Sequence, residues 1–368
     1  RPSSRPKSRR CPSRAKSGLG RVGAWPLALL AALLALVPWG IQEVYAQSTT
    51  SWKTTAQNDD WHNPNNWTNG IPDPNKGASF TTSNYTAINI SSTNGYAAGL
   101  VFSGEANFTI QSPHILVISG GGITVNGGTQ TFNAQPRAAV SGNFPVVVNT
   151  GGFLDVNNTF MVQPNQTATL LFSGGGNVEV NSFSRRYANQ NTNLNIVQNG
   201  PGTLTILSGY SAQGGPQDGG YITGTTTING GVIAISAEAC LGGNPGGYWQ
   251  DSSTWIPGSF DPAALTLNGG TLRATASFAI DDTNRGVTLD SGGGTLDVPN
   301  SAHTLTIANP ITGPGGLTKT GSGTLVLTGQ NTYTGTTTVS EGILEIQHAN
   351  ALGASGTGQG TTVASGAT

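Results

Sequence analysis

Acidic residues that stand close together are the first feature of this sequence with the potential for chemistry. Two clusters are present: Asp59 with Asp60, and Asp281 and Asp282 with Arg285 and Asp290. Two carboxylates at a defined separation can hydrolyse a glycosidic bond, and acidic residues beside a basic one can hold a calcium ion for polysaccharide cleavage. Aspartates are also common in surface turns, which explains both clusters without any reaction. We therefore expect no catalytic residues, and the second cluster is the best candidate if the chain is an enzyme.

Three tryptophans surround the first acidic pair. Trp52, Trp61 and Trp67 lie within 16 residues of Asp59 and Asp60. Aromatic faces beside carboxylates suit a carbohydrate, so these five residues form the candidate binding site. The alternative is structural, because the first coil of a repetitive stack has an apolar face that large aromatic side chains can cover. We favour a cap and retain carbohydrate binding as the alternative.

Neither a metal nor a cofactor is expected. The histidines are far apart in the sequence: His62, His114, His303 and His348. The calcium-binding Gly-Gly-x-Gly-x-Asp repeat does not occur in the sequence. Cys240 has no motif around it and fits a small core residue better than a nucleophile.

Short alternating segments recur through most of the chain. A Gly-rich turn is followed by residues that alternate between aliphatic and Thr, Asn or Ser, which is typical of half-buried strands. The predicted strands include Ile123–Val125, Leu154–Val156, Val178–Val180, Thr203–Leu207, Leu265–Leu267, Thr295–Val298, Thr304–Ile307, Thr324–Thr328 and Ile343–Ile346. The chain has 54 Gly, and only 9% of its residues are charged, which favours turns between strands over charge-rich disorder.

These strands predict an all-β fold without crossover helices. A β-sandwich closes at around 100 residues, whereas no change of composition divides this chain after position 46. Continuous repetition favours a right-handed parallel β-helix, or β-solenoid, with Gly, Asn and Thr at the turns.

The first 46 residues have the pattern of a secretory signal peptide. Eight of the 16 Lys and Arg lie within the first 21 positions, before an apolar segment from Trp25 to Val37 and a Val44-Tyr45-Ala46 cleavage site. A retained membrane anchor at residues 22–41 is the alternative. Removal of residues 1–46 would leave 8 basic and 16 acidic residues, a balance that argues against a nucleic-acid partner.

An internal repeat carries a resemblance to a known family. Residues 199–207 align with 320–328, and 223–230 align with 334–341. The second copy, Leu317–Ile346, closely resembles the autotransporter-associated β-strand repeat of bacterial autotransporter passengers. That resemblance implies a β-helical, surface-displayed passenger and no defined activity.

The expected organisation follows from these segments. Residues 1–46 form the signal peptide, 47–100 an N-terminal cap with the first strands, and 101–368 a solenoid with repeats near 194–242 and 317–353. Autotransporters carry a C-terminal β-barrel translocator, and none precedes Thr368. We expect either that the chain is truncated there or that the protein is anchored or sorted differently, with any membrane link supplied only by a missing C-terminal anchor or translocator.

The predicted function is that of an exported structural or adhesive protein at the cell surface or outside the cell, associated with the outer membrane. Its expected partner is a polysaccharide, a matrix or another cell-surface ligand, with no nucleic acid. The alternatives are a carbohydrate-active β-helix enzyme and a carbohydrate-binding module.

Overall fold

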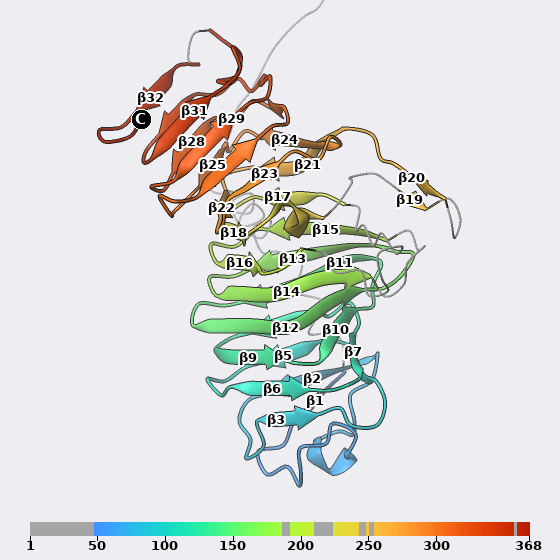
Figure 1. The fold of residues 1–368 in the computed structure, drawn as a ribbon. Coiled ribbons are helices and arrows are strands. Elements are labelled where there is room, and N and C mark those ends of the chain that lie inside the picture. Colours follow the sequence, from blue (N-terminus) through green and yellow to red (C-terminus); the bar gives the residue numbers. More distant parts are fainter. Residues whose placement is uncertain (1–47, 186–191, 210–223, 243–247, 250–253, 357–358) are drawn as a thin grey trace, which may run out of the picture. The chain divides into compact units, whose positions relative to one another are not determined.

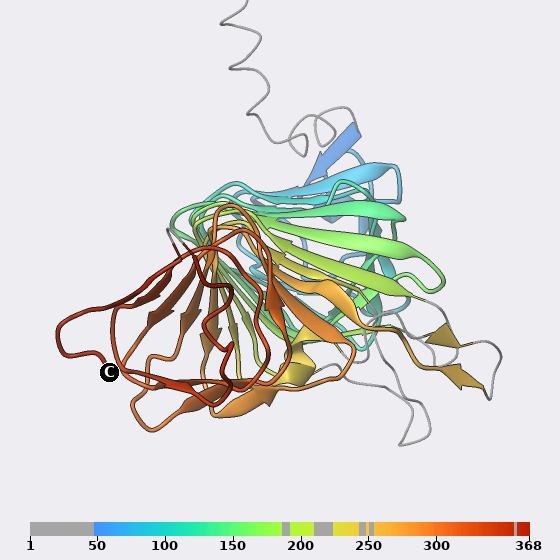
Figure 2. The same cartoon turned by 90° about the horizontal axis from the view of Figure 1, so that it is seen from above.

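The computed structural model describes residues 48–185, 192–209, 224–242, 248–249, 254–356 and 359–368. The predicted signal peptide at residues 1–46 lies outside the described residues. Within the described ranges the chain is a stack of coils built from short parallel strands, which confirms the predicted all-β parallel solenoid (Figure 1). Viewed from above in Figure 2, the strands of successive coils lie over one another around a shared interior.

The first wall of the stack is an 11-stranded parallel sheet among the described residues. In spatial order it contains β1 (Ser48–Ser51), β2 (Lys76–Phe80), β5 (Leu100–Phe102), β8 (Ile123–Val125), β11 (Gly142–Val148), β13 (Thr167–Ser173), β15 (Asn193–Gln198), β17 (Thr226–Ile228), β21 (Asp261–Leu267), β24 (Arg285–Leu289) and β27 (Ile311–Thr312).

The second wall follows the first in each coil. Its strands are β3 (Ala87–Asn89), β6 (Phe108–Gln111), β9 (Gly128–Phe132), β12 (Gly152–Val162), β14 (Asn177–Arg185), β16 (Thr203–Ile206), β18 (Val232–Ile235), β22 (Thr271–Ala274), β25 (Gly294–Asp297), β28 (Leu317–Thr320), β30 (Thr337–Val339) and β32 (Thr361–Val363).

The third wall is made of two separate parts. One contains β4 (Gly95–Ala97), β7 (Ile115–Ile118) and β10 (Gln135–Ala138), and it joins the second wall because β10 pairs with the last residues of β12. The other contains β23 (Phe278–Ile280), β26 (Thr304–Ile307), β29 (Thr324–Leu327) and β31 (Ile343–Ile346).

Three further elements interrupt this regular pattern. The 3₁₀ helix η2 (Pro64–Asn66) belongs to the first coil, and η3 (Glu238–Leu241) contacts β23. An antiparallel hairpin, β19 (Tyr248–Trp249) with β20 (Trp255–Ile256), precedes β21.

Alternation along each strand places one row of side chains per wall in the interior. In the second wall the parallel register aligns buried residues coil by coil, so hydrophobic burial and backbone pairing reinforce each other. That row runs Val178, Leu204, Ile233, Leu272 and Leu296. The core is therefore continuous along the stack and uses no disulfide among the described residues.

Polar residues enter the interior rows at positions that alternation alone would assign to aliphatic side chains. Gln130 donates to the carbonyl oxygens of Ala106 and Gly127, each at 3.0 Å. Gln198 donates to Gly200 O at 3.0 Å and Gly202 O at 2.9 Å. Each amide supplies hydrogen-bond donors that buried turn carbonyls would otherwise lack.

Glycine is required at the corner between the first and second walls. Gly174 has φ +91°, and a Cβ there would lie 2.1 Å from Val148 O in the preceding coil. Gly231 has φ +60°, and its Cβ would lie 2.2 Å from Gly200 O. Both the positive φ and the close approach of neighbouring backbones exclude a larger residue.

Candidate functional site

The three tryptophans of the predicted binding site lie inside the first coil. The ring centroids of Trp52 and Trp67 are 5.0 Å apart, as are those of Trp61 and Trp67, and both pairs meet edge to face. All three rings also contact Phe80, which begins an inward row of the first wall. Trp61 has no exposed surface. The rings cover the interior at this end of the stack and leave no open face against which a sugar could pack.

Hydrogen bonds fix two of these three rings in place, whereas the buried indole Nε1 of Trp61 has no hydrogen-bond partner among the described residues. The indole Nε1 of Trp67 donates to Trp61 O at 2.8 Å. The Nε1 of Trp52 donates to Ser83 Oγ at 3.0 Å and to Tyr85 O at 3.2 Å. Because their polar atoms have partners, burial of Trp52 and Trp67 costs no unsatisfied donor.

The loop that carries Asp59 and Asp60 is held by the buried Asn66. Its side-chain Oδ1 accepts from Gln57 N at 2.8 Å, and its Nδ2 donates to Asn58 O at 3.0 Å and Asp60 O at 2.9 Å. Asn66 ends η2, which is capped by the side chain of Asn63. The two carboxylates are therefore mounted on an ordered segment outside the tryptophan cluster.

Asp59 and Asp60 open onto a polar groove of about 580 Å³. The groove is lined by Asp59, Asp60, Asn89, Ile90, Ser91, Gln111, Ser112 and Pro113. Its lining comes from three successive segments, because Asp60 bridges to Asn89 and Asn89 pairs with Gln111 across β3 and β6. Parallel register thus places side chains from positions 59 to 113 along one edge of the stack.

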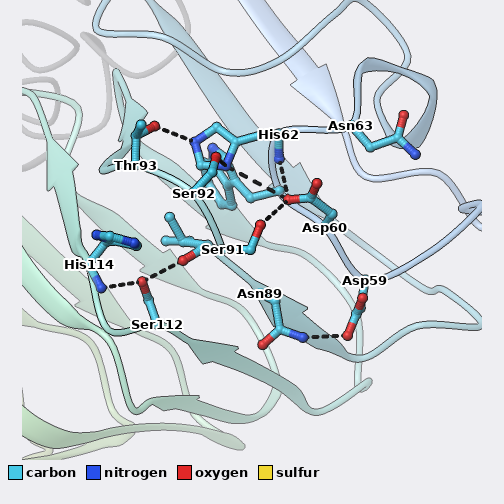
Figure 3. Close-up of polar contacts among 12 residues, drawn as sticks. Asp59, Asp60, His62, Asn63, Asn89, Ser91, Ser92, Thr93, Ser112 and His114 are labelled. Carbon is cyan, nitrogen blue, oxygen red and sulfur yellow. Dashed lines mark hydrogen bonds and ion pairs between the residues drawn. The ribbon is translucent and has the colours of Figure 1, made fainter.

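Hydrogen bonds order the polar side chains at this edge (Figure 3). Asn89 Nδ2 donates to a carboxylate oxygen of Asp59. Asp60 Oδ1 accepts from Ser91 Oγ at 3.1 Å and from His62 N at 3.0 Å. Each carboxylate keeps further acceptor positions, since a carboxylate has about four lone-pair sites.

His62 lies between Asp60 and a run of hydroxyl groups. Its Nε2 is 3.2 Å from Thr93 Oγ1, while its Nδ1 is 3.4 Å from Ser92 Oγ and 3.7 Å from Asp60 Oδ1. A catalytic triad needs a carboxylate hydrogen-bonded to one ring nitrogen and the nucleophile on the other. The Asp60 separation exceeds hydrogen-bonding distance, so this arrangement suits binding better than activation of a hydroxyl.

The second acidic cluster is organised around Glu238, a residue that the sequence did not single out. Arg285 is completely buried, and its Nε donates to Glu238 Oε1 at 2.9 Å. The Glu238 carboxylate also accepts the backbone N–H groups of Asp281 and Asp282 at 3.1 Å. Burial raises the pKa of Glu238, against the opposing effect of these partners. The sequence gives no sign of the pairing between Glu238 and Arg285, because 47 positions separate the two residues.

Arg285 performs a structural role that excludes it from substrate contact. Its Nη1 and Nη2 donate to Leu241 O at 3.3 Å and Gly242 O at 2.5 Å, at the end of η3. Asp290 lies in an exposed turn, where it accepts from Ser291 N at 2.7 Å. The structure therefore does not bring Arg285 and Asp290 together around a shared cleft.

The described parts of the chain contain no group of three or more His, Cys, Asp or Glu side chains that could hold a metal ion. Within the same parts, no helix has the length and apolar character needed to span a membrane. Cys240 is buried at the end of η3.

Comparisons with known proteins bear on the repeat predicted near the end of the chain. The model of the passenger-associated-transport-repeat family matches residues 317–346, which form β28, β29, β30 and β31. An adhesin, the BmaC autotransporter of Brucella suis biovar 1 (strain 1330), is 32% identical over 272 residues, or 70% of this chain. Residues 317–346 therefore carry a passenger-associated-transport repeat, and most of the chain is similar to an autotransporter adhesin. The resemblance inferred from the sequence is thereby confirmed.

A second relative matches this passenger-like protein over a shorter stretch. An extracellular serine protease of Serratia marcescens is 62% identical over 39 residues, or 11% of the chain. The chain spans 7% of the length of the adhesin and 4% of the length of the protease. No solved structure matches it.

Proposed function

We propose that this passenger-like chain is exported and contributes adhesion at the cell surface, without catalysis. The observation that carries the proposal is the similarity to an autotransporter adhesin along 272 residues, together with the parallel solenoid itself. We assign residues 1–46 to the signal peptide, 47–100 to the cap and first strands, and 101–368 to the solenoid, with repeats near 194–242 and 317–353.

The outer surface of the second wall supports an adhesive role. One outward row consists of partly or fully exposed threonines on successive coils: Thr271, Thr295, Thr318, Thr338 and Thr362. Neighbouring strands in a sheet are roughly 4.8 Å apart, so this row repeats hydroxyl and methyl groups at a regular interval. A ligand that is itself repetitive, such as a polysaccharide or matrix polymer, can contact several coils at once.

The polar groove is the proposed local binding site. Asp59 and Asp60 remain candidate ligand contacts, with the tryptophans Trp52, Trp61 and Trp67 as the support beneath them. The lining offers carboxylate, amide and hydroxyl groups, which suit hydrogen bonds to the hydroxyls of a glycan. Its two carboxylates disfavour a nucleic-acid or other polyanionic partner.

The absence of catalysis is proposed from the geometry of the two acidic clusters. Arg285 is committed to Glu238 and to the end of η3, and the imidazole of His62 has no hydrogen-bonded carboxylate among the described residues. The short match to a serine protease covers 39 residues and carries no activity to this chain.

One experiment tests both parts of the proposal, surface display and adhesion. Cells that produce the complete protein are treated with protease while intact, and their attachment to polysaccharide-coated and matrix-coated surfaces is then measured. We expect surface-accessible fragments and loss of attachment after proteolysis. Protection of the protein in intact cells, or attachment unchanged by its removal, would reject the proposal.

The groove is tested with matched carboxylate variants. Asp59→Asn with Asp60→Asn is compared with Asp290→Asn, which changes an exposed turn elsewhere. We expect the double variant alone to weaken attachment. Equal attachment by both variants would place adhesion outside the groove, and polysaccharide turnover by the purified protein would overturn the non-catalytic assignment.

A further inference from the structure

Four Asn-Gly pairs occupy the same corner of the solenoid, between the first and second walls. They are Asn126-Gly127, Asn199-Gly200, Asn229-Gly230 and Asn268-Gly269. Each follows a first-wall strand directly, respectively β8, β15, β17 and β21. Asn149 occupies the corresponding corner after β11, followed by Thr150.

The side chains of these asparagines form hydrogen-bonded ladders along the stack. Asn149 Nδ2 donates to Asn126 Oδ1 at 2.7 Å. In the second ladder, Asn229 Nδ2 donates to Asn199 Oδ1 at 2.8 Å, and Asn268 Nδ2 donates to Asn229 Oδ1 at 3.4 Å. The donors and acceptors all point the same way along the stack, so each ladder has an acceptor end, Asn126 in one and Asn199 in the other.

The acceptor ends differ chemically from the other members. The Oδ1 of Asn126 and of Asn199 receives a hydrogen bond, while their Nδ2 atoms donate to none of the residues that the structure describes. Both residues are exposed to solvent. Asn229 and Asn268, in contrast, have their Nδ2 atoms tied to the preceding coil.

An Asn-Gly pair can lose its side-chain amide without an enzyme. The backbone nitrogen of Gly attacks Cγ of Asn, a new N–Cγ bond forms and the Cγ–Nδ2 bond breaks. Ammonia leaves with the proton from the Gly nitrogen, and a cyclic imide remains. Water then opens one of the two imide C–N bonds to give aspartate or isoaspartate, so the net reaction consumes water and releases ammonia.

The ladder favours this reaction at its acceptor ends. A donor on Oδ1 stabilises the negative charge that develops on this oxygen as Cγ is attacked, and an unbound Nδ2 is free to leave. Gly adds no Cβ to hinder the attack. At Asn268 the attacking nitrogen is itself occupied, because Gly269 N donates to Gly293 O at 2.7 Å.

We propose that Asn126 and Asn199 are spontaneous deamidation sites, and that the same ladders protect Asn229 and Asn268. An aspartate at position 199 still accepts the hydrogen bond from Asn229, now with a charged acceptor. An aspartate at position 229 would lose the donor to Asn199. Deamidation therefore adds negative charge to this corner at the positions where the ladder tolerates it.

The rates can be measured within one chain. The complete exported protein is kept folded in warm, mildly alkaline buffer, and peptide mapping by mass spectrometry follows aspartate and isoaspartate at the four asparagines. We expect Asn126 and Asn199 to react about tenfold faster than Asn229 and Asn268, which corresponds to about 1.4 kcal/mol in activation free energy. Equal rates, or faster reaction at Asn229 and Asn268, would overturn the proposal.

A ladder variant separates activation from simple mobility. Asn229→Ser removes the donor to Asn199, so polarisation predicts slower reaction at Asn199, whereas mobility predicts faster reaction there. Asn157→Ser is the matched control, because Asn157 Nδ2 donates to Asn133 Oδ1 at 3.2 Å in a separate pair. Circular dichroism of both variants checks that the coils remain folded, and acceleration at Asn199 in a folded Asn229→Ser protein would reject the mechanism.

Discussion

The guanidinium of Arg285 and the carboxylate of Glu238 form a buried ion pair, with Nε and Oε1 2.9 Å apart. Arg285 belongs to β24 of the first wall, whereas Glu238 begins η3, so the pair joins two parts of the stack. The same guanidinium binds the carbonyl oxygens of Leu241 and Gly242 at the end of η3. One buried side chain thus fixes the helix that contacts β23 of the third wall.

Replacement of Arg285 tests this role. Arg285→Met should lower the free energy of unfolding by about 3 kcal/mol, because loss of one partner leaves the buried Glu238 charge and two carbonyl oxygens without their donor. Urea denaturation followed by circular dichroism measures the change. Arg273→Met is the control: the Arg273 side chain is 40% exposed, and the buried carboxylate of Asp297 keeps the hydrogen bond from Thr320 Oγ1 at 3.0 Å, so this variant should lose less stability than Arg285→Met. Equal midpoints for the two variants would contradict the structural role.

Stability should also depend on the protonation of Glu238. Burial raises its pKa in the folded state, so between the ordinary value of about 4.3 and that raised value the folded chain binds more protons than the unfolded chain. The stability that protonation of Glu238 contributes is complete below the ordinary pKa and is lost as the pH rises through the raised pKa. As the pH rises through the mildly acidic range, the denaturation midpoint should therefore fall more steeply for the native chain than for the Glu238→Gln variant. Parallel profiles would show that Glu238 does not titrate in this way.

The interior of this protein was largely predictable from alternation, because a residue that alternates in sequence must alternate between core and solvent in a strand. Ile123–Val125 and Thr304–Ile307 are strands with the predicted bounds and bury alternate residues. Ile343–Ile346 is also a strand with the predicted bounds, but its two isoleucines are exposed. The parallel register between them could not be predicted in the same way, because it depends on pairing across coils of variable length.

The candidate site was predictable only as a segment. Proximity in sequence identified Trp61 and Asp60, but it could not show that one side chain points into the core while the other lines a groove. Asn89 and Gln111 were missed because parallel pairing brings them to Asp60 from later coils. Spacing along the chain carries no signal for such contacts.

Lys319 provides a prediction about the matched repeat. It is buried in an inward row between Leu296 and Val339, and its Nζ donates to Thr320 O at 2.7 Å and Gly321 O at 2.6 Å. Lys319→Ala should lower the unfolding free energy by about 2 to 3 kcal/mol, because it removes these donors and leaves a void. Thermal unfolding measures the loss.

The matched lysine control is Lys76→Ala. Lys76 is partly exposed and pairs with Asp73 at 3.8 Å, so its replacement should change stability by less than about 1 kcal/mol. Similar melting temperatures for the two variants would mean that Lys319 does not support the turns of the repeat.

Trp61 distinguishes the cap from a ring that binds sugar. The side chain is fully buried against Trp67 and Phe80, so Trp61→Ala should cost about 3 to 5 kcal/mol through lost contacts and a cavity. Trp61→Phe should cost less because it keeps an aromatic ring in the same space. Thermal unfolding and polysaccharide binding are measured on the same samples. If the Trp61→Ala protein unfolds at the native temperature yet no longer binds, the ring contacts the ligand. If Trp61→Ala unfolds at a lower temperature and Trp61→Phe still binds, the ring belongs to the cap. In that second case burial of the ring stabilises the first coil and does not serve contact with the sugar.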